Sequence, residues 1–443
     1  MGRVGDSPNW AILVHDYSRE VAMKRFWIFS FILLSGCKYA VVPQSDPDGN
    51  AVNYRKNGPP IELPESARPN DATISLYEEG RRTFVSNLKG RGNVYTIKPS
   101  GNALPFQTTS NPRSEILETQ LAEGYILSYL YFDNGVIKYD GKPAKGRFYR
   151  DIDDETLFFT HSTGKSIVSY LVGHAICEGY IGSIDEPVDW PLMSSTLYQG
   201  QPLRALLNMS AGDKHTIDSD RSHYIMGSPR HHRDMDLETI SILLKGTEKK
   251  GDQLFYNNFL ADLIANYVAY KTGPEYGRFL NKIFQDKIGI ENEVHFELHR
   301  KTTSTSSEYY GLNETRASYS FLITRKDLLR VGLAMMKDYQ GQTCVGKYLR
   351  EAQAQAKRWP KYRPNKDNAR FWLHNYAQNY GAQFYFKFQG MDDRNILATE
   401  GYNGQNMMID MDNSRIVVTH SAATAWDQRI FIRNVIRDGK LPK

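Results

Sequence analysis

Two stretches of the chain, one in each half, show the pattern of paired β-strands. Apolar residues run from Tyr125 to Phe132, and after the dipeptide Asn134-Gly135 they resume from Val136 to Tyr139. Asn-Gly between two such runs is a strong indication of a tight hairpin. Near the C-terminus, residues 406–411 and 415–421 repeat the pattern around a polar Asp412-Asn413 turn. We therefore expect strands from both parts of the chain.

Helical spacing of apolar residues marks the segments between these hairpins. One helix begins near Ser162 and ends at Gly179, a second runs over residues 258–271 and ends at Gly273, and a last one runs from about Trp426 to Gly439. Strands at both ends with helices between them predict an α+β fold. Its antiparallel sheet is built from both termini and flanked by helices, with a mainly helical inserted domain.

The N-terminal residues have the pattern of a secretory signal. Residues 23–37 read MKRFWIFSFILLSGC, with two cations, a short apolar run and then Leu34-Ser35-Gly36-Cys37. That ending resembles a bacterial lipobox, which predicts translation from Met23, lipidation of Cys37 and a periplasm-facing protein anchored to a membrane. Since Lys38 rather than Asp follows the cysteine, we expect the outer membrane. A simple cleaved signal or a buried helix is the alternative.

Composition shifts divide the remaining chain. Residues 38–73 are rich in Pro, Asn, Asp and Gly, which predicts a flexible tether. Residues 74–443 form the expected domain, with an α/β part at about 116–190 and 380–443 and a helical part at about 191–379. The pattern at 74–115 assigns no element.

Composition and charge exclude several classes of function. The net charge of +5 is spread along 443 residues without a long basic run, so nucleic acid is not an expected partner. The histidines His231, His232, His295 and His299 stand in polar contexts without metal-ligand spacing, and we expect neither a metal nor a cofactor. Apart from Cys37 there are two cysteines, and Cys177 on an apolar helix face is expected to be a buried free thiol, distant in sequence from Cys344.

Ser162-Thr163-Gly164-Lys165 is an S-x-x-K tetrad at the start of a predicted helix. Residues three apart on a helix are neighbours, so the Lys165 amine can activate the Ser162 hydroxyl as a nucleophile. The helix N-terminus favours a developing negative charge there. A phosphate-binding P-loop is excluded because position 159, which would have to be glycine, is Phe159.

A second proton-handling group stands at Tyr256-Asn257-Asn258, a Y-x-N motif just before a helix. A lysine ammonium nearby would depress the pKa of Tyr256, so that its hydroxyl could pass a proton to the leaving group. The amide of Asn258 could hold a substrate carbonyl. Taken alone, the motif favours a packing aromatic at Tyr256 and a helix N-cap at Asn258.

In this order the motifs resemble those of the class C β-lactamase and penicillin-recognising serine hydrolase superfamily. Three further segments carry the resemblance, which covers roughly residues 124–437: 182–188 (GSIDEPV), 203–212 (LRALLNMSAG) and 251–273. The resemblance implies a β-lactamase/transpeptidase-like fold, with Ser162 as acylated nucleophile, Lys165 as its base and Tyr256 as proton carrier. It also implies a substrate-binding amide at Asn258 and an oxyanion donor at the Ser162 backbone N–H.

The third motif of that family, Lys or His two residues before Gly, is absent. Residues 396–405 contain Glu400 instead, followed by Gly401-Tyr402-Asn403-Gly404-Gln405. This G-x-x-G-Q is similar to that of the 6-aminohexanoate-dimer hydrolase and esterase branch, which implies that the Tyr402 N–H is the second oxyanion donor and that Gly401 permits close approach.

The sequence therefore predicts a cofactor-free serine hydrolase that cleaves a small-molecule ester, linear amide or short peptide-like substrate. A β-lactamase or D-alanyl-D-alanine peptidase is one alternative, and a non-catalytic binding lipoprotein is another. The acyl group, the preference between ester and amide, and the oligomeric state stay open.

Overall fold

The protein is described here by a computed structural model. It covers residues 94–145, 148, 151–218, 224–226, 228, 235–298, 314–366, 369–423 and 426–443. The predicted signal segment, its lipidation site Cys37, the tether at 38–73, and His231, His232 and His299 lie outside the described residues. Within the described ranges, no helix has both the length and the apolar character needed to cross a membrane.

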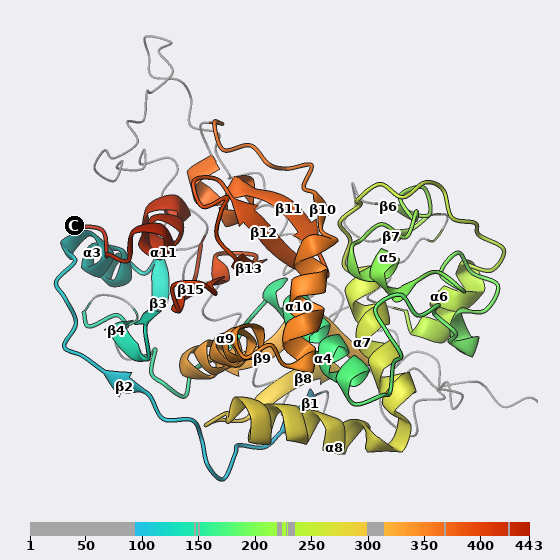
Figure 1. Ribbon diagram of the computed structural model, residues 1–443, viewed down its shortest axis with the longest axis horizontal. Coiled ribbons are helices and arrows are strands. Elements are labelled where there is room, and N and C mark those ends of the chain that lie inside the picture. The colour runs from blue at the N-terminus through green and yellow to red at the C-terminus, as the bar shows by residue number, and fades with distance from the viewer. Residues whose placement is uncertain are drawn as a thin grey trace, which may run out of the picture. The chain divides into compact units, whose positions relative to one another are not determined.

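Strands from both halves of the chain meet in one large sheet, as the hairpin patterns predict (Figure 1). The two halves join where β15 runs antiparallel to β3, with Val418 opposite Leu130. All neighbouring pairs are antiparallel except β2 and β4. The nine strands, in spatial order, are β10 (Lys357–Arg358), β11 (Ala377–Gly381), β12 (Phe384–Phe388), β13 (Ile396–Gly401), β14 (Gln405–Asp410), β15 (Arg415–Ser421), β3 (Ile126–Asp133), β4 (Val136–Gly141) and β2 (Gln107–Thr108).

A smaller sheet lies partly in the region expected to be mainly helical. Its four strands follow the order β1 (Val94–Ile97), β8 (Val294–Leu298), β9 (Thr315–Thr324) and β5 (Leu157–Phe159). Phe296 and Phe321 are opposite each other in the β8–β9 pair, with ring centroids 4.6 Å apart. Part of the segment 74–115, to which the sequence pattern assigned no element, forms strand β1. A separate two-stranded ribbon joins β6 (Ile217–Asp218) to β7 (Tyr224–Ile225).

The helices that the apolar spacing predicts are present. The helix expected from Ser162 is α4 (Thr163–Cys177), the one expected over 258–271 is α7 (Phe259–Thr272), and the last helical segment ends at Gly439 as expected. The other α-helices are α3 (Glu115–Glu123), α5 (Leu203–Leu207), α6 (Leu237–Leu243), α8 (Tyr276–Asn281), α9 (Arg325–Gln340), α10 (Cys344–Ala354) and α11 (Asn434–Asp438). Helical segments of 3-10 or π type in the described residues are η2 (Pro191–Met193), η4 (Gly273–Glu275), η5 (Lys282–Ile288), η6 (Ala369–Phe371), η7 (Leu373–Tyr376) and η8 (Arg429–Arg433).

Helices cover both faces of the large sheet. On one face α9 packs on β3, β14 and β15, where the Cα of Gly332 lies so close to Met407 that an added Cβ would be 2.6 Å from its sulfur. On the other face, the hydroxyl of Tyr129 donates a hydrogen bond to the backbone of Phe431 in η8. Helix α4 is buried between α7, α10, β9 and the strands β13 and β14. The residue that precedes α4 is therefore held by both sheets.

The expectation of a free thiol at Cys177 is wrong, because Cys177 forms a disulfide with Cys344. The two residues are 167 positions apart in sequence, but α4 ends where α10 begins, and their Cα atoms lie 5.7 Å apart. Sequence distance is a poor guide to spatial distance in a fold that packs α10 directly on α4. The bond therefore ties the end of the central helix to the helix beside it.

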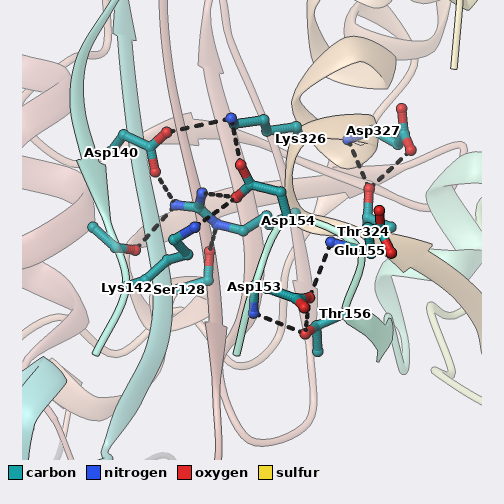
Figure 2. Close-up of polar contacts among 12 residues, drawn as sticks. Ser128, Asp140, Lys142, Asp153, Asp154, Glu155, Thr156, Thr324, Lys326 and Asp327 are labelled. Carbon is teal, nitrogen blue, oxygen red and sulfur yellow. Dashed lines mark hydrogen bonds and ion pairs between the residues drawn. The ribbon is translucent and has the colours of Figure 1, made fainter. Parts of the chain in front are cut away.

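A buried arginine anchors the segment that leads to α4, together with Asp140, Asp154 and Lys326, which Figure 2 labels. Arg325, the first residue of α9, donates to Ser128 in β3 and forms ion pairs with Asp140 in β4 and with Asp154. Lys326 adds a second bond to Asp154, at 2.6 Å. Burial would raise the pKa of Asp154, but the bonds from Lys326 and Arg325 hold that pKa well below its usual range. This network fixes the chain at Asp154, three residues before β5 and seven residues before His161.

Candidate active site

Ser162 lies at the start of α4, directly after a strained residue. Strand β5 ends at Phe159, and His161 then adopts a φ of 46° in the left-handed region, which costs about 1 kcal/mol or more for a residue with a side chain. Ser162 follows with a φ of −64° and stands at the N-cap of α4, without a side-chain capping bond. The Ser162 hydroxyl therefore makes no capping bond at the start of α4 and is available for other contacts.

Lys165 lies one turn further along α4 and reaches back to Ser162, as the S-x-x-K spacing predicts. Its Nζ atom is 2.9 Å from the Ser162 Oγ atom, and the lysine side chain is 1% exposed. Burial lowers the pKa of Lys165 to about 7, against the opposing effect of the Asp262 carboxylate. A large share of the amine is therefore neutral near neutral pH, which is the form that can accept a proton.

Tyr256 completes a group of three around the serine. Its hydroxyl shares a hydrogen bond with the Ser162 side chain, and the Lys165 Nζ atom lies 5.2 Å from the centre of its ring. The structure thus brings Ser162, Lys165 and Tyr256 together although 90 residues separate the last two.

The expectation of a depressed pKa for Tyr256 is wrong. Burial raises the pKa of Tyr256 well above its usual value, the bond to Ser162 lowers it less, and the Glu400 charge raises it further. Since Lys165 also loses much of its positive charge through burial, the cation that should have lowered the pKa of Tyr256 is weakened. The tyrosine is therefore neutral in this site and keeps its hydroxyl proton.

The loop that carries Tyr256 is held by Asn257, the variable position of the Y-x-N motif. Asn257 accepts a hydrogen bond from the Leu260 N–H at 3.0 Å and donates one to Asp213 at 3.2 Å. Asp213 is buried, which raises its pKa to about 6, and it also accepts from the hydroxyl of Tyr198. The N-cap role that the sequence left open for Asn258 thus belongs to Asn257, and the Asn258 side chain makes no cap bond to α7.

Strand β13 approaches the nucleophile through Gly401. A Cβ atom added to Gly401 would lie 2.2 Å from the carbonyl oxygen of Thr160, so only glycine fits this contact. The next residue, Tyr402, stands with its ring edge-to-face to that of His161, at a centroid distance of 5.8 Å. The G-x-x-G-Q segment and the Ser162 turn are therefore in direct contact, while the oxyanion role of the Tyr402 N–H stays a prediction.

Two further contacts lock this arrangement. The hydroxyl of Thr163, next to Ser162, donates to the backbone carbonyl of Gln405 at 2.8 Å and lies 3.0 Å from the hydroxyl of Thr399. The amide of Gln405 itself bonds to the Ser421 carbonyl in β15. Residues of α4, β13, β14 and β15 thus hold the start of α4 in one position, and Thr163 is a site residue that sequence reasoning missed.

Glu400 is a buried acidic residue in the motif where the related family has a lysine or a histidine. It is 5% exposed, and its Oε2 atom accepts bonds from the backbone N–H and the Nδ1 atom of His374, at 2.6 and 3.0 Å. No lysine or arginine among the described residues forms an ion pair with it.

Of the four histidines considered as metal ligands in the sequence, only His295 is described, and it is buried with a hydrogen bond to Thr96.

Comparison with known proteins gives the same architecture. No protein-family model matches the sequence, and a search of curated proteins found no match. Among solved structures, a provisional 6-aminohexanoate-dimer hydrolase from Bacillus anthracis is 14% identical, with a TM-score of 0.56 over 85% of this chain and 100% of that one. A provisional β-lactamase from Bacteroides dorei is 15% identical, with a TM-score of 0.49 over 69% and 89%. A D-amino acid amidase from Ochrobactrum anthropi is 16% identical, with a TM-score of 0.47 over 70% and 90%.

Identities this low establish the fold and leave the substrate undetermined. The fold predicted from the sequence, an antiparallel sheet from both termini with flanking helices, agrees with the strand order observed here and with the similarity to the 6-aminohexanoate-dimer hydrolase structure. The chain therefore has a β-lactamase/transpeptidase-like fold.

Proposed function

We propose that the protein is a serine hydrolase that cleaves an ester or a linear amide through an acyl-enzyme on Ser162. The observation that carries the proposal is the contact between the Ser162 Oγ and Lys165 Nζ atoms, 2.9 Å apart, with the lysine buried and its pKa lowered to about 7. A neutral amine at hydrogen-bond distance from a hydroxyl is what general-base activation of a serine needs.

In the proposed reaction, the Ser162 oxygen attacks the substrate carbonyl while its proton passes to Lys165. The protonated Tyr256 hydroxyl, bonded to Ser162, donates to the leaving oxygen or nitrogen and is reprotonated from Lys165. Backbone N–H groups of Ser162 and Tyr402 stabilise the oxyanion, and Asn258 binds a substrate carbonyl. Water then attacks the acyl-enzyme by the reverse route and restores Ser162.

The preference for esters and linear amides over β-lactams and peptidoglycan peptides rests on Glu400. A carboxylate buried beside Gly401 repels a substrate carboxylate that is adjacent to the scissile bond, as in those two classes, whereas the carboxylate of a linear aminohexanoate dimer is five methylenes away from it. The solved structure of similar fold described as a 6-aminohexanoate-dimer hydrolase points toward linear amides.

A substrate screen tests the proposal. Purified protein lacking residues 1–37 would be offered p-nitrophenyl acetate and butyrate, a linear 6-aminohexanoate dimer and nitrocefin, each against Ser162→Ala. Turnover of an ester or of the dimer that Ser162→Ala abolishes is the expected result. Nitrocefin turnover would contradict the substrate class, and failure of a serine-directed fluorophosphonate to label Ser162 would favour the non-catalytic binding protein.

We also propose that the protein faces the periplasm from a lipid anchor on Cys37. The lipobox-like Leu34-Ser35-Gly36-Cys37 supports this location, and so does the Cys177–Cys344 disulfide, because disulfides persist in oxidising compartments. Labelled palmitate should enter the wild-type protein expressed in a Gram-negative host and should be absent from Cys37→Ser. Equal labelling of the two would contradict the anchor.

A further inference from the structure

Gln405, the last residue of the G-x-x-G-Q segment, takes no part in the proposed reaction, yet its side chain is fully buried and hydrogen-bonded. Its Nε2 atom donates to the backbone carbonyls of Ser421 at 2.6 Å and of Asn403 at 3.3 Å. Its Oε1 atom lies 3.0 Å from the Nδ1 atom of His420, and because an amide oxygen can only accept, this Nδ1 atom carries the proton. The side chain of Gln405 therefore joins strand β15 to the turn between β13 and β14.

Gln405 is also connected to the chain on both sides of Ser162. Before the nucleophile, the ring of Phe158 in β5 stacks on the ring of His420, with centroids 4.2 Å apart and an angle of 8° between the two planes. After the nucleophile, the Thr163 hydroxyl donates to the backbone carbonyl of Gln405 at 2.8 Å. The strand that leads to Ser162, the helix that follows it and the G-x-x-G-Q turn thus meet at Gln405.

The turn at residues 401–404 fixes the direction of the Tyr402 N–H. The Gly404 N–H donates to the carbonyl of Gly401 at 3.1 Å. That carbonyl and the Tyr402 N–H belong to one trans peptide group and point in opposite directions, so the bond orients both. Asn403, within the turn, has a left-handed φ of 61°, and its carbonyl is the one that Gln405 holds. A left-handed residue other than glycine keeps this conformation because its surroundings hold it.

We propose that Gln405 and His420 are positioning residues that align the two oxyanion donors, the backbone N–H groups of Ser162 and Tyr402. The two donors lie on elements far apart in the chain and must point at one oxygen atom of the substrate. A misplacement of about 1 Å can cost a hundredfold in rate. As a statement about catalysis this rests on the proposed function, whereas the hold of Gln405 on the turn does not require turnover.

Gln405→Met tests the proposal through turnover. The substitution preserves the length of the side chain and the backbone bond from Thr163, and it removes the side-chain hydrogen bonds. For p-nitrophenyl butyrate, kcat should fall about a hundredfold while KM changes less than about threefold, because the oxyanion forms only after attack on the carbonyl. The affinity for n-butylboronic acid, whose serine adduct carries an oxygen where the oxyanion forms, should fall about tenfold.

Gln201→Met is the matched control. Gln201 is also buried, and its Nε2 atom donates to the carbonyls of Leu197 and Ala211 at 2.6 and 2.9 Å. The control variant loses comparable bonds elsewhere in the chain, so its melting temperature should fall while its kcat stays within about twofold of wild type. Equal losses of kcat in the two folded variants would show that Gln405 acts only through stability and would overturn the inference.

His420→Phe is a milder variant, because it keeps a ring on Phe158 and removes only the bond to Gln405. Its kcat should fall about tenfold, and His420→Phe/Gln405→Met should lose no more than Gln405→Met alone, since both changes break the same link. Losses that multiply in the double variant would overturn the role of His420.

Hydrogen–deuterium exchange, followed by mass spectrometry of peptides that cover residues 401–405, tests the hold on the turn without any chemistry. Exchange there should be at least about tenfold faster in Gln405→Met than in wild type, and unchanged in Gln201→Met. Hydrolysis by wild type with an unaltered kcat in Gln405→Met would overturn the inference and leave the proposed function standing. Faster exchange in Gln405→Met of a protein that hydrolyses no ester or amide would support the positioning of the turn and overturn the proposed function.

Discussion

The Nζ atom of Lys165 lies 2.9 Å from the Oγ atom of Ser162, and the lysine is almost completely buried. Burial makes an ordinary surface cation into a base that is partly neutral near pH 7, while the helix fixes the distance between base and nucleophile. The same burial keeps Tyr256 protonated. Burial thus has opposite effects on the two groups: it favours a neutral Lys165 amine that can accept a proton, and a neutral Tyr256 hydroxyl that keeps its proton.

Removal of the Lys165 amine should abolish most of the activity without unfolding the protein. In Lys165→Met, kcat should fall by roughly a thousandfold or more, as is usual when an activating base is lost. The Lys165 amine is protonated in the unfolded chain, and on folding it must either lose its proton or be buried as a cation. Both cost free energy of folding, and Met avoids that cost, so the variant should melt at the same or a higher temperature. Esterase assays and thermal melts check both; near-normal turnover would contradict the base role.

The pH dependence should report the lowered pKa of Lys165. Because the base must be unprotonated, kcat/KM should rise about tenfold per pH unit below about pH 7 and level off above it. The raised pKa of Tyr256 predicts no fall before about pH 10, where an unperturbed tyrosine begins to ionise. A pH profile of p-nitrophenyl acetate hydrolysis, corrected for the buffer reaction, checks this. A plateau that extends unchanged to pH 5 would be inconsistent with Lys165 as the base.

The sequence predicts the parts of this site that are local in the chain and misses those that depend on tertiary packing. Ser162 and Lys165 are three residues apart on one helix, so their contact follows from helix geometry alone. The Tyr256 pKa was predicted with the wrong sign, because it depends on burial and on Glu400, 144 positions away in the chain.

The fold shows the same division. The Asn134-Gly135 hairpin and the helices α4 and α7 follow from local patterns, and all three are present. Strands β8 and β9 gain their stability from pairing with each other and with β1, and their separate patterns gave no indication of a sheet. Likewise, no property of the segments around Cys177 and Cys344 indicates that they meet.

The contact between Gly401 and Thr160 should be sensitive to a single methyl group. In Gly401→Ala the added Cβ would lie 2.2 Å from the Thr160 carbonyl oxygen, so β13 must move away from the Ser162 turn. A shift of about 1 Å can cost a hundredfold in rate, and overpacking costs about 1–3 kcal/mol of stability. Gly101→Ala is the control, since its Cβ would meet nothing within 4 Å. Equal kcat values for the two variants would show that this contact does not position the site.

Substitution of the two asparagines of the Tyr256 loop should separate stability from catalysis. Asn257→Ala removes the cap to Leu260 and the bond to Asp213, and it should lower the free energy of unfolding by about 2 kcal/mol. Asn258→Ala removes no capping bond and should destabilise less, while its kcat/KM falls at least about tenfold because a substrate contact is lost. Urea unfolding and steady-state kinetics distinguish them. The opposite pattern would make Asn257 the substrate-binding amide.

The disulfide should support the fold without taking part in the reaction. It closes a loop between residues 167 positions apart, so its loss in Cys177→Ser should lower the free energy of unfolding by about 2–5 kcal/mol. Ser162 stands at the other end of α4, about 20 Å away at 1.5 Å per residue, so kcat well below the melting temperature should stay within about twofold of wild type. Dithiothreitol should therefore lower the melting temperature of wild type and leave that of Cys177→Ser unchanged. A large loss of kcat in the folded variant would mean that α4 transmits strain from the disulfide to the nucleophile.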